Sequence, residues 1–183
     1  NNWLEGNTIA LGSTGNKTFS ASFIINSYTV TFDGNTATSG SMADQSIDYN
    51  ATESLDSNTF IKTGYSFAGW NTADDNSGTS YLNGANYTMG TSNVTLYAIW
   101  SVNSYDVIFN GNTETSGSMS NQTFDYNETA NLTANAYLKI GYIFANWNTA
   151  SDGSGTAYAN SVSYTMGTSG LTLYAIWTIN TYS

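Results

Sequence analysis

Carboxylates are the main groups in this sequence that could act in catalysis, because the chain contains no histidine and no cysteine. Two acidic positions recur after 77 residues, as Asp48 with Asp125 and as Asp75 with Asp152. Facing carboxylates can hydrolyse glycosidic bonds. Here one position lies in an expected strand and the other in an expected turn, and neither has a nucleophile or base nearby in the pattern. We therefore predict that the protein is not an enzyme.

A calcium site is a second chemistry to consider. Asp74, Asp75 and Asn76 place oxygen ligands on a turn, and Asp152 stands in the matching turn. Calcium is bound by oxygen ligands of this kind. The spacing is not that of an EF-hand, however, and the second turn has fewer ligands. We expect a solvated turn and no cofactor, with calcium as the alternative.

Lys62 and Lys139 are two of only three basic residues, and they also lie 77 residues apart. A lysine beside an asparagine or a carboxyl group could form an intramolecular isopeptide bond. The simpler interpretation is that each lysine pairs with an acid or extends along the surface at the start of a strand.

The spacing of these residues reflects an internal repeat, which determines architecture more strongly than any local pattern. The clearest matches are 64–70 with 141–147, 96–100 with 173–177, and 28–34 with 105–111. We predict four parts: residues 1–25 as the last third of a preceding repeat, 28–104 and 105–181 as complete repeats, and 182–183 as the start of another.

Each complete repeat is expected to be mainly β. Tyr28, Val30 and Phe32 alternate with polar residues, which is typical of a half-buried strand. Residues 94–100 are apolar on both faces and should form a central strand. Residues 50–62 are irregular and should form a long connection or a short helix.

The apolar positions give the expected core and two sets of alternatives. In the second repeat the expected core is Val107, Phe109, Phe124, Tyr126, Leu132, Tyr142, Phe144, Trp147, Tyr158, Tyr164, Met166, Leu171, Leu173, Ala175 and Trp177. Trp70, Trp100, Trp147 and Trp177 should belong to the core, and stacking on sugars is the alternative. Tyr97, Ile99, Tyr174 and Ile176 face the other side of their strands, where they could pack on an adjacent repeat or on a covering segment.

Three segments of each repeat resemble the Listeria–Bacteroides repeat, the internalin B-repeat family of bacterial surface proteins. In the first repeat these are residues 28–35, 62–70 and 96–100. The resemblance implies a small β-grasp-like, ubiquitin-related module, repeated in tandem as an elongated array. It also implies export and a role as stalk, spacer or binding unit. The sequence departs from the family where prolines usually precede Lys62, and where Asn146 replaces a glycine.

Composition limits the partners. The formal net charge is −10, which argues against nucleic acid because phosphate recognition needs basic groups. No apolar run is long enough to span a bilayer, so no direct membrane insertion is expected. We predict a structural or adhesive region on the surface of a prokaryote, with neighbouring repeats as its partners. The alternatives are a module for a carbohydrate or protein ligand, with a host or cell-surface glycan or protein as its partner. Copies of the chain could also form a fibre through their incomplete end repeats.

Overall fold

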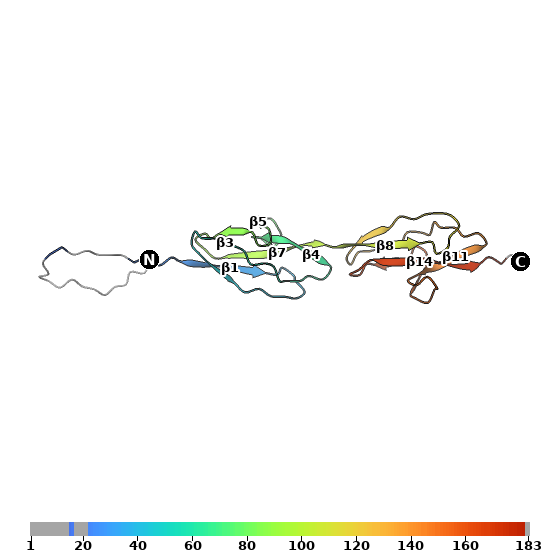
Figure 1. Ribbon diagram of the computed structural model, residues 1–183, viewed down its shortest axis with the longest axis horizontal. Helices are drawn as coiled ribbons and strands as arrows, with labels where there is room; N and C mark the ends of the chain where they lie inside the picture. Colours follow the sequence, from blue (N-terminus) through green and yellow to red (C-terminus); the bar gives the residue numbers. More distant parts are fainter. Residues whose placement is uncertain (1–14, 17–21, 182–183) are drawn as a thin grey trace.

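The computed structural model describes residues 15–16 and 22–181, so most of the predicted partial repeat at residues 1–25 lies outside the described part. The described residues contain strands and no helix. Two similar units follow one another along the long axis of the molecule (Figure 1). The mainly β, tandem and elongated arrangement predicted from the sequence is therefore confirmed.

Each repeat contains one five-stranded sheet and one two-stranded sheet. In the first repeat the strands are β1 (Ser27–Asp33), β2 (Gln45–Asp48), β3 (Thr52–Ser54), β4 (Tyr65–Asn71), β5 (Ser80–Tyr81), β6 (Asn86–Thr88) and β7 (Val94–Val102). In the second they are β8 (Ser104–Asn110), β9 (Gln122–Asp125), β10 (Thr129–Asn131), β11 (Tyr142–Asn148), β12 (Ala157–Tyr158), β13 (Ser163–Thr165) and β14 (Leu171–Ile179).

The long strand of each repeat lies in the middle of its sheet. The strand orders are β2-β1-β7-β4-β5 and β12-β11-β14-β8-β9. β7 pairs in parallel with β1, where Val30 is opposite Val94, and antiparallel with β4, where Trp70 is opposite Ala98. The prediction that residues 94–100 form a central strand is therefore confirmed.

The β-grasp assignment stays an interpretation. The irregular segment 55–61 contains no helix, and its apolar residues act as anchors: Leu55 is buried and Phe60 is half-buried. β3 instead pairs with β6, with Glu53 opposite Tyr87. The backbone is held outside the strands by bonds such as Leu55 N–H to the Ala85 carbonyl, at 2.9 Å.

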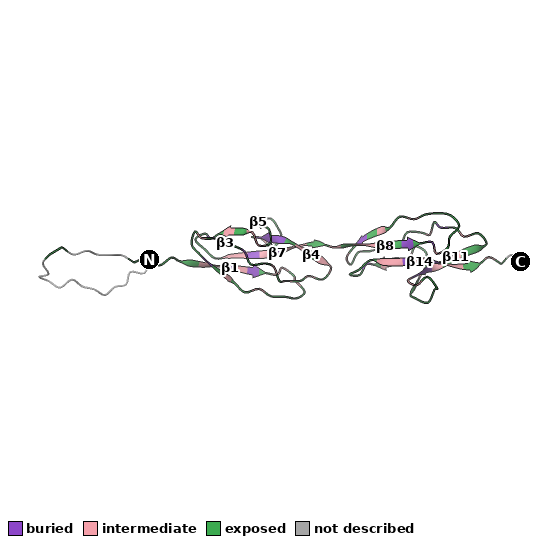
Figure 2. Ribbon diagram, in the orientation of Figure 1, coloured by how far each residue is buried: buried purple, intermediate pink, exposed green. Residues whose placement is uncertain are grey.

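Each repeat has its own core, and the two cores share no residue. Buried positions follow the middle strands of each sheet (Figure 2). The fully buried Trp70 contacts Phe32 and Phe67, each with ring centroids 4.9 Å apart. Trp147 has the same surroundings in the second repeat. The prediction that these two tryptophans are core residues is confirmed.

Three positions in the second repeat differ from the expected core. Tyr137 is buried, and its hydroxyl donates to the Phe109 carbonyl at 2.8 Å, although the irregular segment around it gave no periodic signal. Tyr126 and Tyr142 were expected in the core, and this was wrong: both lie at the ends of the repeat, and Tyr142 is 39% exposed. Strand alternation identifies the inward face of a sheet, but it does not indicate where the core stops along the strand.

A hydrogen-bonded carboxylate, Asp106, is present in the second five-stranded sheet but not at the matching position of the first. Asp106 on β8 accepts hydrogen bonds from the Thr123 hydroxyl at 2.6 Å and from the Asn121 amide at 3.2 Å. The Thr123 hydroxyl is the larger of the two causes that lower the pKa of Asp106 below its ordinary value of 3.8. The matching residue of the first repeat is Thr29, which cannot titrate.

We expect truncation of Leu55 to destabilise the first repeat alone. Leu55 is only 2% exposed, and Leu55→Ala should lower the free energy of unfolding of this repeat by ~2–5 kcal/mol because it leaves a cavity. Amide hydrogen exchange resolves the two repeats. The control is Leu82→Ala, where the side chain is 75% exposed and should contribute little. Equal loss of protection in both repeats would show that the cores are coupled.

We expect Asp106→Asn to change the acid sensitivity of the second repeat. A carboxyl whose pKa is lowered by folding stabilises the folded state above its unfolded pKa of 3.8, and this contribution disappears as the pH falls through the folded value. Urea titrations followed by NMR between pH 6 and pH 2 should therefore show a shallower loss of stability in the variant. The first repeat is the internal control, and an unchanged slope in the second repeat would contradict the assignment.

Candidate functional site at the junction between the repeats

The two repeats are joined through a single residue. β7 ends at Val102 and β8 begins at Ser104, so only Asn103 lies between them. The Asn103 N–H donates to the Gly64 carbonyl of the first repeat at 2.9 Å, and its carbonyl accepts from the Tyr126 N–H of the second repeat at 2.8 Å. Its side-chain oxygen accepts from the Ser66 hydroxyl at 2.6 Å. One residue therefore connects the backbones of both repeats.

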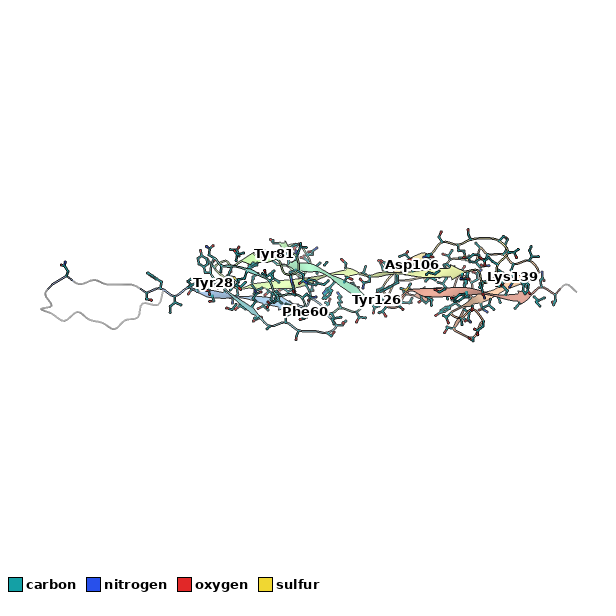
Figure 3. All side chains as sticks on the ribbon, in the orientation of Figure 1. Tyr28, Phe60, Tyr81, Asp106, Tyr126 and Lys139 are labelled. Carbon is teal, nitrogen blue, oxygen red and sulfur yellow. The ribbon has the colours of Figure 1, made fainter. Side chains whose placement is uncertain are left out.

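Tyr126 packs across this junction. Its side chain lies at the boundary of the two repeats (Figure 3). The ring meets Tyr65 edge to face, with centroids 6.1 Å apart, a geometry that aromatic pairs favour. Gly64 has φ +78°, and a Cβ at this position would overlap the Tyr126 ring. Glycine is therefore needed here both for the left-handed backbone and for the close approach of the ring.

The same residue types recur at the two outer ends without a partner repeat among the described residues. Tyr49 matches Tyr126, and its N–H donates to the Asn26 carbonyl at 2.8 Å. Asn180 matches Asn103, and its N–H donates to the Gly141 carbonyl at 2.8 Å. Tyr49 is 51% exposed, whereas Tyr126 is half-buried. The junction is thus a repeated motif, and contact between repeats accounts for the burial of its tyrosine.

Sequence reasoning did not identify Asn103, Gly64 or Tyr126 as junction residues. The signal was present, because Asn, Gly and Tyr recur at these positions every 77 residues. It was missed because the tyrosine was assigned to the core.

The four residues proposed from the sequence for a contact between repeats lie elsewhere. Tyr97 and Ile99 are in the middle of β7, opposite Asn71 and Gly69 of their own repeat. Ile99 borders a depression of about 240 Å³ that is also lined by Trp70 and Tyr81. Both residues are half-buried, as are their counterparts Tyr174 and Ile176 in the second repeat. Equal burial in both repeats favours the alternative in which a segment of the same repeat covers them. In the second repeat Ile176 lies near Gly153 of the acidic turn.

Lys62 and Lys139 each hold a loop of their own repeat. The Lys62 amine donates to the Thr36 hydroxyl at 2.7 Å and lies 4.5 Å from the centroid of the Tyr65 ring. The Lys139 amine has the same arrangement with Thr113 and Tyr142. An isopeptide bond requires a carboxyl or carboxamide carbon beside the amine. Among the described residues, each amine instead contacts a threonine hydroxyl and a tyrosine ring, neither of which can form such a bond.

The acidic turns are organised by two buried asparagines. The Asn71 side-chain oxygen accepts from the N–H groups of Ala73 at 2.9 Å and Gly78 at 3.0 Å, and its amide donates to the Asn76 oxygen at 3.0 Å. Asn148 accepts the matching pair of N–H bonds in the second repeat. These asparagines were not singled out from the sequence, because an asparagine in a turn-rich stretch gives no sign of burial.

Two of the calcium candidates, Asp75 and Asp152, each point one carboxyl oxygen at the backbone of their own turn. Asp75 accepts from the Ser77 N–H at 3.0 Å, and Asp152 accepts from the Ser154 N–H at 2.9 Å. Hydrogen bonds from these serines lower the pKa of both carboxyls. Asp74 is joined to Asn35 through its backbone carbonyl. Over residues 15–16 and 22–181, no group of three or more acidic side chains that could hold a metal ion is present.

The recurrent acids Asp48 and Asp125 have a structural contact. They accept hydrogen bonds from the hydroxyls of Ser27 and Ser104, each at 2.6 Å. These bonds fasten β1 to β2 and β8 to β9. No helix of the described chain is long and apolar enough to cross a membrane.

We expect the acidic turns to fold without a cation. Addition of calcium at millimolar concentration, or of a chelator, should leave the thermal midpoint unchanged, because one oxygen of Asp75 and one of Asp152 already accept a backbone N–H of the turn. Calorimetry in both conditions checks this. A rise of the midpoint with calcium that is lost in Asp75→Asn, but kept in Asp56→Asn, would show that the turn binds the ion.

Comparison with known proteins agrees with the repeated architecture. The model of the Listeria-Bacteroides repeat domain matches residues 28–99 and again residues 105–176. A "Putative Gly-rich membrane protein" of Evansella cellulosilytica is 44% identical over 136 residues, which cover 70% of this chain and 16% of that protein. A "Putative membrane protein" of the same organism is 35% identical over 162 residues, covering 87% and 24% respectively.

The chain thus spans less than a quarter of each of these relatives. No solved structure is significantly similar to it. The two family matches lie on the two repeats seen in the structure, and together they cover most of the sequence. The chain therefore belongs to the Listeria-Bacteroides repeat domain family.

Proposed function

We propose that this chain is a section of a semi-rigid stalk or spacer on a bacterial surface protein. The observation that carries the proposal is the one-residue link at Asn103, which is hydrogen-bonded to both repeats. A spacer must keep its modules in a fixed direction, and a link of this kind restricts bending between them.

The junction differs physically from a flexible linker. Linkers rich in glycine and serine behave as random coils because nothing fixes their backbone. At Asn103 both backbone groups are bonded, and each such bond contributes ~1 kcal/mol net. The edge-to-face contact of Tyr65 and Tyr126 adds ~0.5–1.5 kcal/mol. Bending would have to break several of these contacts together.

The long central strand of each repeat sets most of the length that the repeat adds to the spacer. β7 contains nine residues and should span about 30 Å at the usual rise per residue. Because β8 starts one residue after β7, successive repeats add their lengths. A spacer function also agrees with the relatives, whose names as membrane proteins point to a membrane or surface context.

Binding of a sugar through the tryptophans has less support. Trp70 and Trp147 are fully buried. Trp100 and Trp177 are half-buried, and their indole N–H groups donate to the carbonyls of Gly34 and Gly111 at 3.0 and 2.9 Å. A stacking platform needs exposed ring faces, so these four tryptophans are poorly placed to form one.

We expect Tyr126→Ala to loosen the junction while both repeats stay folded. NMR relaxation of backbone amides measures whether the repeats tumble as one elongated body. In the natural chain they should share one anisotropic correlation time, and in the variant their apparent correlation times should fall and separate. Tyr49→Ala is the matched control, because this tyrosine occupies the same position in its repeat but lies outside the junction. Independent tumbling of the natural chain would refute the spacer proposal.

A glycine pair provides a second control within the same experiment. Gly64 and Gly141 have nearly the same backbone angle, φ +78° and +79°. Alanine at either position should therefore cause similar backbone strain, of ~1–2 kcal/mol. Only Gly64→Ala should also loosen the junction, because no atom lies within 4 Å of a Cβ built on Gly141. Equal effects of the two variants on tumbling would mean that the Tyr126 contact is unimportant.

A further inference from the structure

The first and last strands of each repeat lie side by side and run in the same direction. In the first repeat, residues 30–33 of β1 pair in parallel with residues 94–97 of β7. In the second repeat, residues 107–110 of β8 pair in the same way with residues 171–174 of β14. The chain therefore enters each repeat on one strand and leaves it on the neighbouring strand of the same sheet.

Parallel pairing decides how these strands respond to a pulling force. The start of β1 and the end of β7 lie at opposite ends of the paired segment, and both strands run along the long axis of the molecule (Figure 1). Tension along this axis pulls β1 backward and β7 forward, so the two strands are sheared. The hydrogen bonds of a parallel pair are evenly spaced along the strands, so shear loads all of them together. Bonds between strands that are pulled apart from one end would break one after another.

Side-chain hydrogen bonds join the same two strands beyond the paired residues. The Asn35 amide donates to the Ala98 carbonyl at 3.0 Å, and the Trp100 indole N–H donates to the Gly34 carbonyl at 3.0 Å. The second repeat has both matching bonds, at 3.0 and 2.9 Å. Because Gly34 and Asn35 directly follow β1, these bonds also resist sliding of β1 along β7.

The paired segment is part of the core. Val30 and Leu96 are fully buried, and Phe32 is 6% exposed. Hydrogen bonds are stronger in such surroundings than in water. Sliding of the strands would also move these side chains out of the core and expose apolar area to water, which is unfavourable.

We infer that the β1–β7 and β8–β14 pairs are the force-bearing elements of the chain, and that they keep each repeat folded when the array is pulled along its axis. The tension passes from β1 to β7, through Asn103 to β8, and on to β14. Residues 34–93 lie between the paired strands in the sequence, so they stay outside the path of the tension until the pair separates. Their release then adds about 200 Å of extended chain. This inference rests on the proposed spacer function, because tension acts on a spacer that connects two bodies.

One bond of the first repeat provides a specific test of this path. The Thr29 N–H donates to the Asn93 side-chain oxygen at 2.9 Å, which joins β1 to the residue before β7. Gly170 stands at the matching position of the second repeat. Glycine at position 93 therefore removes this bond with a residue that the fold already accepts at this place.

The first experiment compares two directions of pulling on the first repeat of the full chain. The chain has no native cysteine, so introduced cysteines can hold the handles of an optical trap. Ser27→Cys with Ser101→Cys loads β1 and β7 from opposite ends, whereas Ser27→Cys with Ser92→Cys pulls them apart from one end. All three serines are exposed. We expect a several-fold higher rupture force for the first pair of handles, and equal forces would overturn the inference.

The second experiment holds the chain with Ser27→Cys and Ser101→Cys at constant force and measures the rate of rupture, which governs forced unfolding. Asn93→Gly and Trp100→Phe each remove one side-chain bond of the β1–β7 contact. Each should raise the rate about fivefold, the factor that corresponds to one net hydrogen bond.

The matched control is Thr52→Ala. This change removes the bond between the Thr52 and Thr88 hydroxyls, which joins β3 to β6 outside the path of the tension, and it should leave the rate unchanged. An equal rise in all three variants, or no rise in Asn93→Gly and Trp100→Phe, would overturn the inference. Both handles lie within one repeat, so these outcomes are independent of the junction. The spacer proposal is judged separately, by the tumbling of the two repeats.

Discussion

The structure depends on one buried tryptophan in each repeat, because a small module without disulfides must obtain its stability from a few large side chains. Trp70 contacts Phe32 from β1, Phe67 from β4 and Phe60 from the irregular segment, at centroid distances of 4.9, 4.9 and 6.3 Å. It therefore joins strands that are far apart in the sequence. Its indole nitrogen is buried without a hydrogen-bond partner, as is that of Trp147. Burial of the ring system must outweigh the unfavourable free energy of that unpaired group.

Asparagine side chains fix many of the turns in this protein. The chain contains no proline, yet its turns are fixed. Buried Asn71 and Asn148 bind the backbone of the acidic turns from inside. The Asn58 side-chain oxygen accepts a hydrogen bond from the Phe60 N–H at 3.0 Å. This bond fixes the backbone of the irregular segment, which is not helical. Asn50 and Asn127 take left-handed backbone angles, which asparagine tolerates better than most residues.

An asparagine also organises the junction between the repeats. Asn103 uses its N–H, its carbonyl and its side-chain oxygen, and each bonds a different residue around the junction. Gly64 leaves space for the Tyr126 ring, whereas the identical Gly141 faces no atom within 4 Å. The same motif is therefore filled by a tyrosine ring at Gly64 and has no such contact at Gly141 among the described residues.

The sequence by itself determined the repeat, the β class and the central position of residues 94–100, because these follow from identity at fixed spacing and from local alternation of apolar residues. It also indicated that the tryptophans of β4 and β11 are buried. Only the tertiary structure decided that residues 55–61 are not helical, that Asn71 is buried, and that Tyr126 packs on Gly64 and Tyr65. These features depend on contacts between residues that are distant in the chain, and a local pattern contains no information about which distant residue will lie opposite. The periodicity of a strand shows which face is apolar, but only the packed molecule determines whether that face meets its own core, a neighbouring repeat or solvent.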